Sequence, residues 1–99
     1  MKKTGFIALD LATSLYLECS ELKLKNPVKD QLLRASLSIA LKITEGSGRL
    51  SLKEKRRFYS IAMGSLRETQ TLMIIIQNKD LAERYDRLGA LVYGLIRST

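Results

Sequence analysis

Apolar residues recur along most of the chain at intervals of three and four, which is the spacing of one helix face. Four such segments are separated by short turns. The first runs from about Thr4 to Leu22, and the chain then breaks the pattern at Asn26 and Pro27, where Asn can cap a helix and Pro suits its first position. The more apolar stripe of this first segment consists of Ala8, Ala12, Leu15, Cys19 and Leu22.

The second helix is predicted from Pro27 to about Glu45. Gly46 follows it, and Gly readily adopts the left-handed conformation that ends many helices. The third helix is predicted to start at Ser51, because Ser51 and Glu54 have the spacing of a capping box. Its apolar seam consists of Phe58, Ala62, Ser65, Thr69, Leu72 and Ile76.

A turn over residues 78–80 separates the third segment from the last. We expect Asn78 to end the third helix and Asp80 to cap the fourth, with Glu83 three positions later. The apolar stripe of the fourth helix consists of Leu81, Tyr85, Leu88, Val92 and Leu95.

Four helices joined by short turns predict an all-α fold, an antiparallel up-down-up-down four-helix bundle that forms a single domain over residues 1–99. The run "LMIII" at residues 72–76 places apolar side chains nearly all round the third helix. A bundle of 99 residues can hardly bury every face of one long helix, so we expect the chain to form oligomers. An isologous dimer and a cyclic ring are both compatible with this pattern.

The residue inventory argues against catalysis. The chain has no His and a single Cys, and its Gly residues lack the spacing of a phosphate-binding loop. We therefore expect no enzymatic activity, no metal and no cofactor. Cys19 falls inside an apolar stripe, which favours a buried small side chain over a reactive thiol. No apolar run reaches 18 residues, so we expect no membrane span. Lys2 and Lys3 before an apolar stretch could suggest a signal peptide, but Asp10 interrupts that stretch and the helical pattern continues through Glu21, so we expect a cytoplasmic protein.

Two further features concern helix packing. Arg34 on the second helix and Glu68 on the third flank apolar stripes, so they could meet across the bundle as an ion pair or remain two unrelated surface charges. Gly64 lies in the middle of the third helix, where Gly costs about 1 kcal/mol relative to Ala. We expect a neighbouring helix to approach closely there, the alternative being an exposed glycine with no packing role.

Positive charge is concentrated in the middle of the chain. The formal net charge is +7, and residues 49–78 carry six Lys or Arg residues against two Glu residues. Cations at the start of a helix oppose its dipole, which supports a use for them in binding phosphates. A solvated face that maintains solubility is the alternative. The candidate nucleic-acid-binding residues are Arg49, Lys53, Lys55, Arg56 and Arg57.

Two stretches in the middle of the chain resemble a known family. They are "SIALKITEG" at residues 38–46 and "KEKRRFYSIAMGSLRE" at residues 53–68. They look like the bacterial four-helix bundle family first noticed as reading frames inside 23S rRNA intervening sequences, although Ala40, Lys42 and Thr44 depart from its pattern. The residues that match are Ser38, Ile39, Ile43, Glu45, Gly46, Phe58, Ile61 or Ala62, Gly64, Ser65 and Glu68.

The resemblance implies a cytoplasmic bacterial bundle that commonly assembles as a homopentameric ring. It also implies a relationship to the accessory variability determinant of diversity-generating retroelements, a basic protein that binds nucleic acid and a reverse transcriptase. Two functions follow as expectations. The first is non-specific binding of RNA or DNA through basic residues of the second and third helices. The second is a protein scaffold or adaptor, for example for a reverse transcriptase, with no direct contact to nucleic acid.

Overall fold

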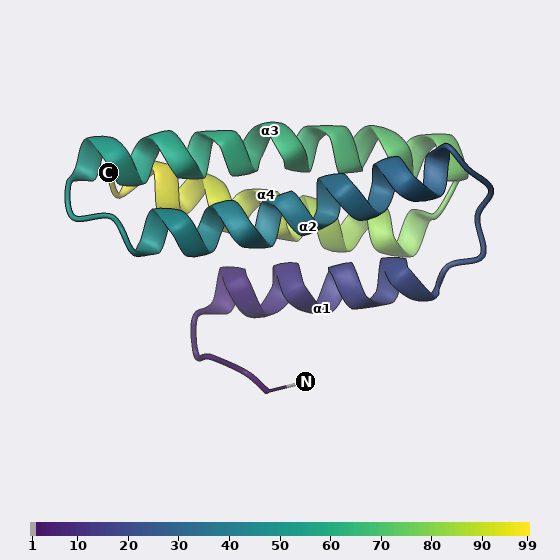
Figure 1. Cartoon of the computed structure of the whole chain (residues 1–99), viewed down its shortest axis with the longest axis horizontal. Helices are drawn as coiled ribbons and strands as arrows, with labels where there is room; N and C mark the ends of the chain where they lie inside the picture. Colours follow the sequence, from purple (N-terminus) through teal and green to yellow (C-terminus); the bar gives the residue numbers. More distant parts are fainter. Residues whose placement is uncertain (1) are drawn as a thin grey trace.

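The computed structural model describes residues 2–99 and places most of them in four α-helices. These are α1 (Ile7–Glu21), α2 (Val28–Ser47), α3 (Leu52–Ile76) and α4 (Lys79–Arg97). No strand occurs in the described part of the chain. The predicted all-α four-helix bundle is therefore confirmed (Figure 1).

The chain passes back and forth along the long axis of the molecule (Figure 1). It runs to the right along α1, to the left along α2, to the right along α3 and to the left along α4. α1 contacts α2 and α4, and α3 contacts the same two helices. Each helix thus has two neighbours, and the apolar stripes of all four helices meet around one core.

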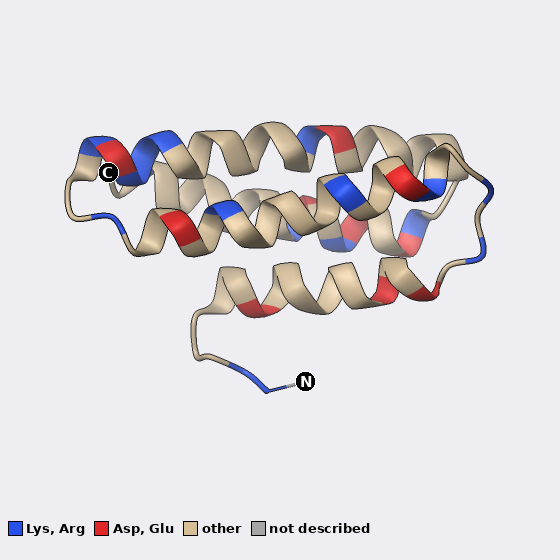
Figure 2. Ribbon diagram, in the orientation of Figure 1, with Lys and Arg blue, Asp and Glu red and all other residues tan. Residues whose placement is uncertain are grey.

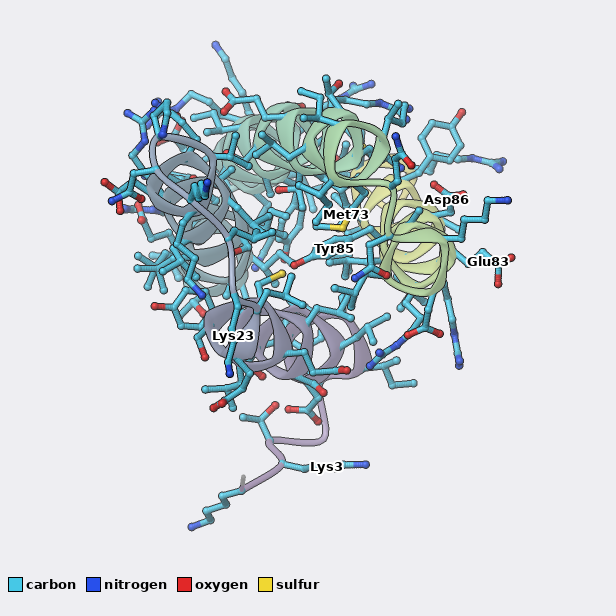
Figure 3. All side chains as sticks on the ribbon, turned by 90° about the vertical axis from the view of Figure 1, so that its right-hand side faces the viewer. Lys3, Lys23, Met73, Glu83, Tyr85 and Asp86 are labelled. Carbon is cyan, nitrogen blue, oxygen red and sulfur yellow. The ribbon has the colours of Figure 1, made fainter. Side chains whose placement is uncertain are left out.

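The core contains much of each predicted stripe, but Leu22, Leu72, Ile76 and Leu95 are only partly buried. Leu66 and Met73 of α3 are fully buried, although the predicted seam omits them. The largest fully buried side chains of the core include Tyr85 and Met73, which point into the space between the helices (Figure 3). Cys19 is also fully buried, as expected, and its Sγ lies 3.2 Å from the hydroxyl oxygen of Tyr85. Burial raises the pKa of the Cys19 thiol and that of the Tyr85 hydroxyl. Both groups therefore stay neutral near neutral pH.

Both helix ends at the turn from α3 to α4 lie elsewhere than the sequence predicts, whereas the start of α3 agrees with the prediction. Ser51 caps α3 as predicted, its side chain accepting a hydrogen bond from the Glu54 N–H. The cap of α4, however, is Asn78 and not Asp80, because the Asn78 side-chain oxygen accepts from the Leu81 N–H at 3.1 Å. The residue that ends α3 in the left-handed region is Gln77, with φ 58° and ψ 40°.

Gly46 does not end α2, contrary to the prediction. The helix continues to Ser47, and Gly46 is a buried helical residue. A Cβ atom at this position would lie 2.6 Å from Cε1 of the Tyr59 ring and 3.2 Å from Cβ of Phe58. The absence of a side chain at Gly46 therefore allows α2 and α3 to approach closely near the turn that joins them.

The prediction that a neighbouring helix approaches closely at Gly64 is wrong within one chain. This glycine is exposed, and a Cβ atom there would meet nothing within 4 Å. The ion pair between Arg34 and Glu68 is likewise not formed among residues 2–99: Arg34 donates to the side-chain oxygen of Gln31 instead. A hydrogen bond between the hydroxyls of Ser38 and Ser65, 2.8 Å apart, joins α2 and α3 midway along their length.

Candidate nucleic-acid interface

Basic residues gather at the end of the bundle where α2 turns into α3. Figure 2 shows Lys and Arg on the first turns of α3, on the connection before it and on the last turns of α2. The connection and the start of α3 carry all five residues that the sequence nominates, from Arg49 to Arg57. The structure divides these five residues into three groups with different surroundings.

Lys55 forms the first group, because its ammonium is engaged within the fold. Its Nζ donates to the carbonyl oxygen of Ser47 at 3.0 Å and lies 3.5 Å from that of Gly46. These carbonyls belong to the last turn of α2, and that of Gly46 also accepts a hydrogen bond from the Arg49 N–H at 3.2 Å. Lys55 thus caps α2, and it is the weakest of the five candidates for a ligand contact.

Arg49 and Arg57 form the second group, because both lie over the ring of Phe58. The guanidinium carbon of Arg49 is 4.5 Å from the ring centroid, and that of Arg57 is 4.6 Å from it. Phe58 is only 6% exposed, so the ring is a fixed platform. Lys42, which the sequence reasoning did not nominate, is a third cation near this ring, with Nζ 5.7 Å from the centroid.

Two carboxylates accompany these three cations. Glu54 pairs with Nε of Arg57 at 3.2 Å, and Glu45 pairs with Nζ of Lys42 at the same distance. Both pairs are partly exposed to solvent, so each stabilises the fold by less than about 1 kcal/mol. Within residues 2–99, Arg49 has no carboxylate within 4 Å, so positive charge remains in excess around the ring.

Lys53 and Arg56 form the third group. Both side chains are exposed, and neither has an ion-pair partner among the described residues. They lie three positions apart on α3 and so occupy neighbouring places on its surface. Their charges face solvent and remain available to an anion.

The position of Lys55 corrects the argument from the helix dipole. A cation at the start of α3 opposes the dipole of α3, but the antiparallel neighbour α2 ends beside it with its negative pole. Lys29 at the start of α2 does the same for α1, donating to the carbonyl oxygen of Ser20 at 3.0 Å and also to that of Leu22. Part of the basic character at helix starts therefore has a structural use and needs no ligand.

The remaining chemistry of this region is modest. Tyr59, which packs against Gly46, is buried, and burial raises the pKa of its hydroxyl. Nowhere in residues 2–99 do three or more His, Cys, Asp or Glu side chains gather closely enough to hold a metal ion. Across the same residues, every helix is too short or too polar to cross a membrane.

Comparison with known proteins identifies the family. A search of curated proteins found no match, and a search of solved structures also found none. A family model described as 23S rRNA-intervening sequence protein matches residues 4–94, a range that includes α1, α2, α3 and most of α4. Since the match covers nearly the whole chain, the protein belongs to the 23S rRNA-intervening sequence protein family.

Proposed function

We propose that the protein is a non-enzymatic nucleic-acid-binding protein that contacts the phosphate backbone of RNA or DNA. The contact surface consists of Arg49, Lys53, Arg56 and Arg57, with Lys42 beside them. The observation that carries this proposal is the excess of cations at one end of the bundle, where Lys53, Arg56 and Arg49 have no carboxylate partner among residues 2–99. Lys55 is left out, because it caps α2.

Binding through this surface is expected to tolerate any base sequence. The Lys and Arg side chains of this surface are exposed to solvent, and they suit contacts with phosphates. Phosphate contacts carry no information about the base sequence. Each phosphate that the protein neutralises should contribute about −0.9 to the slope of log affinity against log salt concentration for a duplex. A steep salt dependence is therefore the signature of this mode of binding.

We also propose that several copies assemble, with a pentameric ring as the expected form. Apolar side chains on the outward sides of α2 and α3 support this: Leu41 is 51% exposed and Ile75 57% exposed, and Leu37 and Ile61 are also exposed. Arg34 and Glu68 add opposite charges to the same two helices, and a neighbouring copy could pair them. Repeating a weak basic surface around a ring raises overall affinity by multivalency.

Binding of a duplex and of a structured RNA at about 50 mM and about 200 mM salt tests the proposal. We expect binding at the lower concentration and a loss of at least tenfold at the higher one. Light scattering with a mass estimate on the same samples gives the number of copies. A protein that assembles normally but binds neither nucleic acid at low salt would refute nucleic-acid binding, and a monomeric mass would refute the ring.

A protein scaffold is the second candidate, and the end of α3 favours it. Ile74 is 75% exposed and lies at an apolar hollow where α3 turns into α4, lined also by Met73 and Ala82. A partner such as a reverse transcriptase could dock there without any nucleic acid. If the protein is a scaffold, the double variant Lys53→Gln with Arg56→Gln should capture the partner as well as the natural protein does. Nuclease treatment should not release the partner, and release by nuclease would contradict the scaffold function.

A further inference from the structure

We propose that Arg49 and Arg57, held against the ring of Phe58, clamp one phosphodiester phosphate of a bound nucleic acid. This inference rests on the proposed function and deepens it. The other cations of the surface add attraction without a fixed geometry. The clamp would be the point at which the backbone of the nucleic acid is positioned.

The first support is the location of the two guanidinium groups. Both lie over one buried ring, at 4.5 Å and 4.6 Å from its centroid. Their side chains come from different places, Arg49 from the turn before α3 and Arg57 from its second turn. An Arg that rests on an aromatic ring keeps its N–H groups free at the edge of the guanidinium plane, and it loses less side-chain entropy when it binds.

The second support is the charge around the ring. Lys42, Arg49 and Arg57 surround Phe58, and among residues 2–99 only two carboxylates, Glu45 and Glu54, pair with any of them. Glu54 occupies Nε of Arg57, which leaves the terminal nitrogens of that residue for another acceptor. An anion between Arg49 and Arg57 would relieve the repulsion among the three cations and supply the missing negative charge.

The chemistry of the ligand follows from the donors. A phosphodiester has two charged oxygens outside the chain, and each can accept N–H donors from a different guanidinium. Lysine cannot replace arginine here without loss, because an ammonium has neither the planar fork nor the stacking surface. Lys79 and Arg87 are exposed on α4, outside the contact surface, so exchange between Lys and Arg at those positions should leave binding unchanged.

This difference gives a test that keeps the net charge constant. The variants are Arg49→Lys and Arg57→Lys, with Lys79→Arg and Arg87→Lys as matched controls, all in the full-length protein. The probe is a duplex of about 20 bp at low salt. We expect each clamp variant to bind about tenfold more weakly, since each loses charge-assisted hydrogen bonds. The controls should stay within about twofold, and the salt slope should not change, because the number of charges is unchanged.

A second variant removes the platform and leaves both arginines in place. Phe58→Leu should weaken binding of the same duplex to a similar degree, provided that circular dichroism shows a folded bundle at the binding temperature. If Phe58→Leu does not fold, the two lysine variants decide alone, because they leave the core intact. Nuclear magnetic resonance of the Arg side-chain N–H groups then reports whether Arg49 and Arg57 respond to the duplex more strongly than Arg56.

The outcomes separate the clamp from the function on which it rests. If the natural protein binds no duplex and no RNA at low salt, the proposed function is refuted and the clamp with it. If it binds, but Arg49→Lys and Arg57→Lys bind as well as the controls, nucleic-acid binding stands and the clamp is refuted. Competition identifies the source of the phosphate: release of the duplex by about 1 mM inorganic phosphate or by anionic vesicles, at constant ionic strength, would overturn a nucleic-acid clamp.

Discussion

Replacing Gly46 by Ala tests whether the close approach of α2 and α3 is a requirement of the fold. The new Cβ would lie 2.6 Å and 2.8 Å from two carbons of the Tyr59 ring, and 3.2 Å from Cβ of Phe58. Tyr59 is only 5% exposed, and Cβ of Phe58 is fixed to the backbone, so neither neighbour can move freely. Overpacking of this kind costs about 1–3 kcal/mol.

A helical Gly replaced by Ala also gains about 0.5–1 kcal/mol from backbone entropy, which partly offsets the overpacking. We therefore expect Gly46→Ala to lower the free energy of unfolding by about 1–2 kcal/mol. Gly64→Ala is the matched control. It is another helical glycine, but its Cβ would meet nothing within 4 Å, so this variant should gain about 0.5–1 kcal/mol.

Urea denaturation followed by circular dichroism measures both variants at one fixed protein concentration, since assembly would make stability depend on concentration. The expected difference in stability between the two variants is about 1.5–3 kcal/mol, which corresponds in thermal melts to about 6–24 °C at about 4–8 °C per kcal/mol for a domain of this size. A Gly46→Ala protein as stable as Gly64→Ala would refute the reasoning, because the steric term would then be absent.

Three further predictions follow from helix ends and from one ion pair. Lys55→Gln should destabilise the fold by about 0.5–1 kcal/mol in urea denaturation, because the last carbonyls of α2 lose a charged donor. Asn78→Ala should cost about 1 kcal/mol and Asp80→Ala clearly less, because Asn78 caps α4; the reverse order in the same assay would contradict this assignment. Glu18 pairs with Arg84 across α1 and α4, and the hydrogen bonds from that guanidinium are the main cause of a lowered pKa of Glu18. The pair therefore contributes to the free energy of unfolding above the ordinary pKa of Glu, and this contribution is lost as the pH falls through the lowered pKa. Glu18→Gln should therefore be less stable than the natural protein by less than about 1 kcal/mol at pH 7 and equally stable at the acid end of a pH series, and a difference that persists there would refute the pairing.

Features that depend on neighbours in the sequence were predictable. The four helices follow from apolar periodicity, and the start of α3 follows from Ser51 and its spacing to Glu54. The error at the start of α4 was also local, since Asn78 and Asp80 are both good caps and the sequence does not say which of them turns first. The backbone conformation decides which residue caps α4, because Gln77 is left-handed and α4 begins directly after Asn78.

Features that depend on another helix were not predictable. The sequence marks Gly46 and Gly64 as unusual, but only the docked helices reveal that Gly46 touches α3 and that Gly64 touches nothing. Arg34 and Glu68 could be placed near the same groove but not joined, because rotation of each helix about its axis decides which side chains meet.

The candidate site shows the same limit. Sequence reasoning found the basic run but treated its members as equivalent. Lys55 turns back to α2, and Lys42 reaches Phe58 from α2, and neither fact is visible in a charge count. A sequence signal for Lys42 did exist, because its charge lies four residues before Gly46, close to the turn that leads into the helix of Phe58. A cation at that place can reach the ring of Phe58, the aromatic residue near the start of the next helix.

The cap that Lys55 places on α2 has a consequence for how the molecule folds. In an isolated α3, the Lys55 ammonium would weaken the helix start, and an isolated α2 would lack a charged donor for its last turn. Both penalties disappear only when the two helices lie side by side, so helix formation and hairpin closure should occur together. The ring of Phe58 and the cations around it are assembled from both sides of the same hairpin. The candidate binding surface is therefore a product of cooperative folding, and a fragment that carries the basic run alone should lack its geometry.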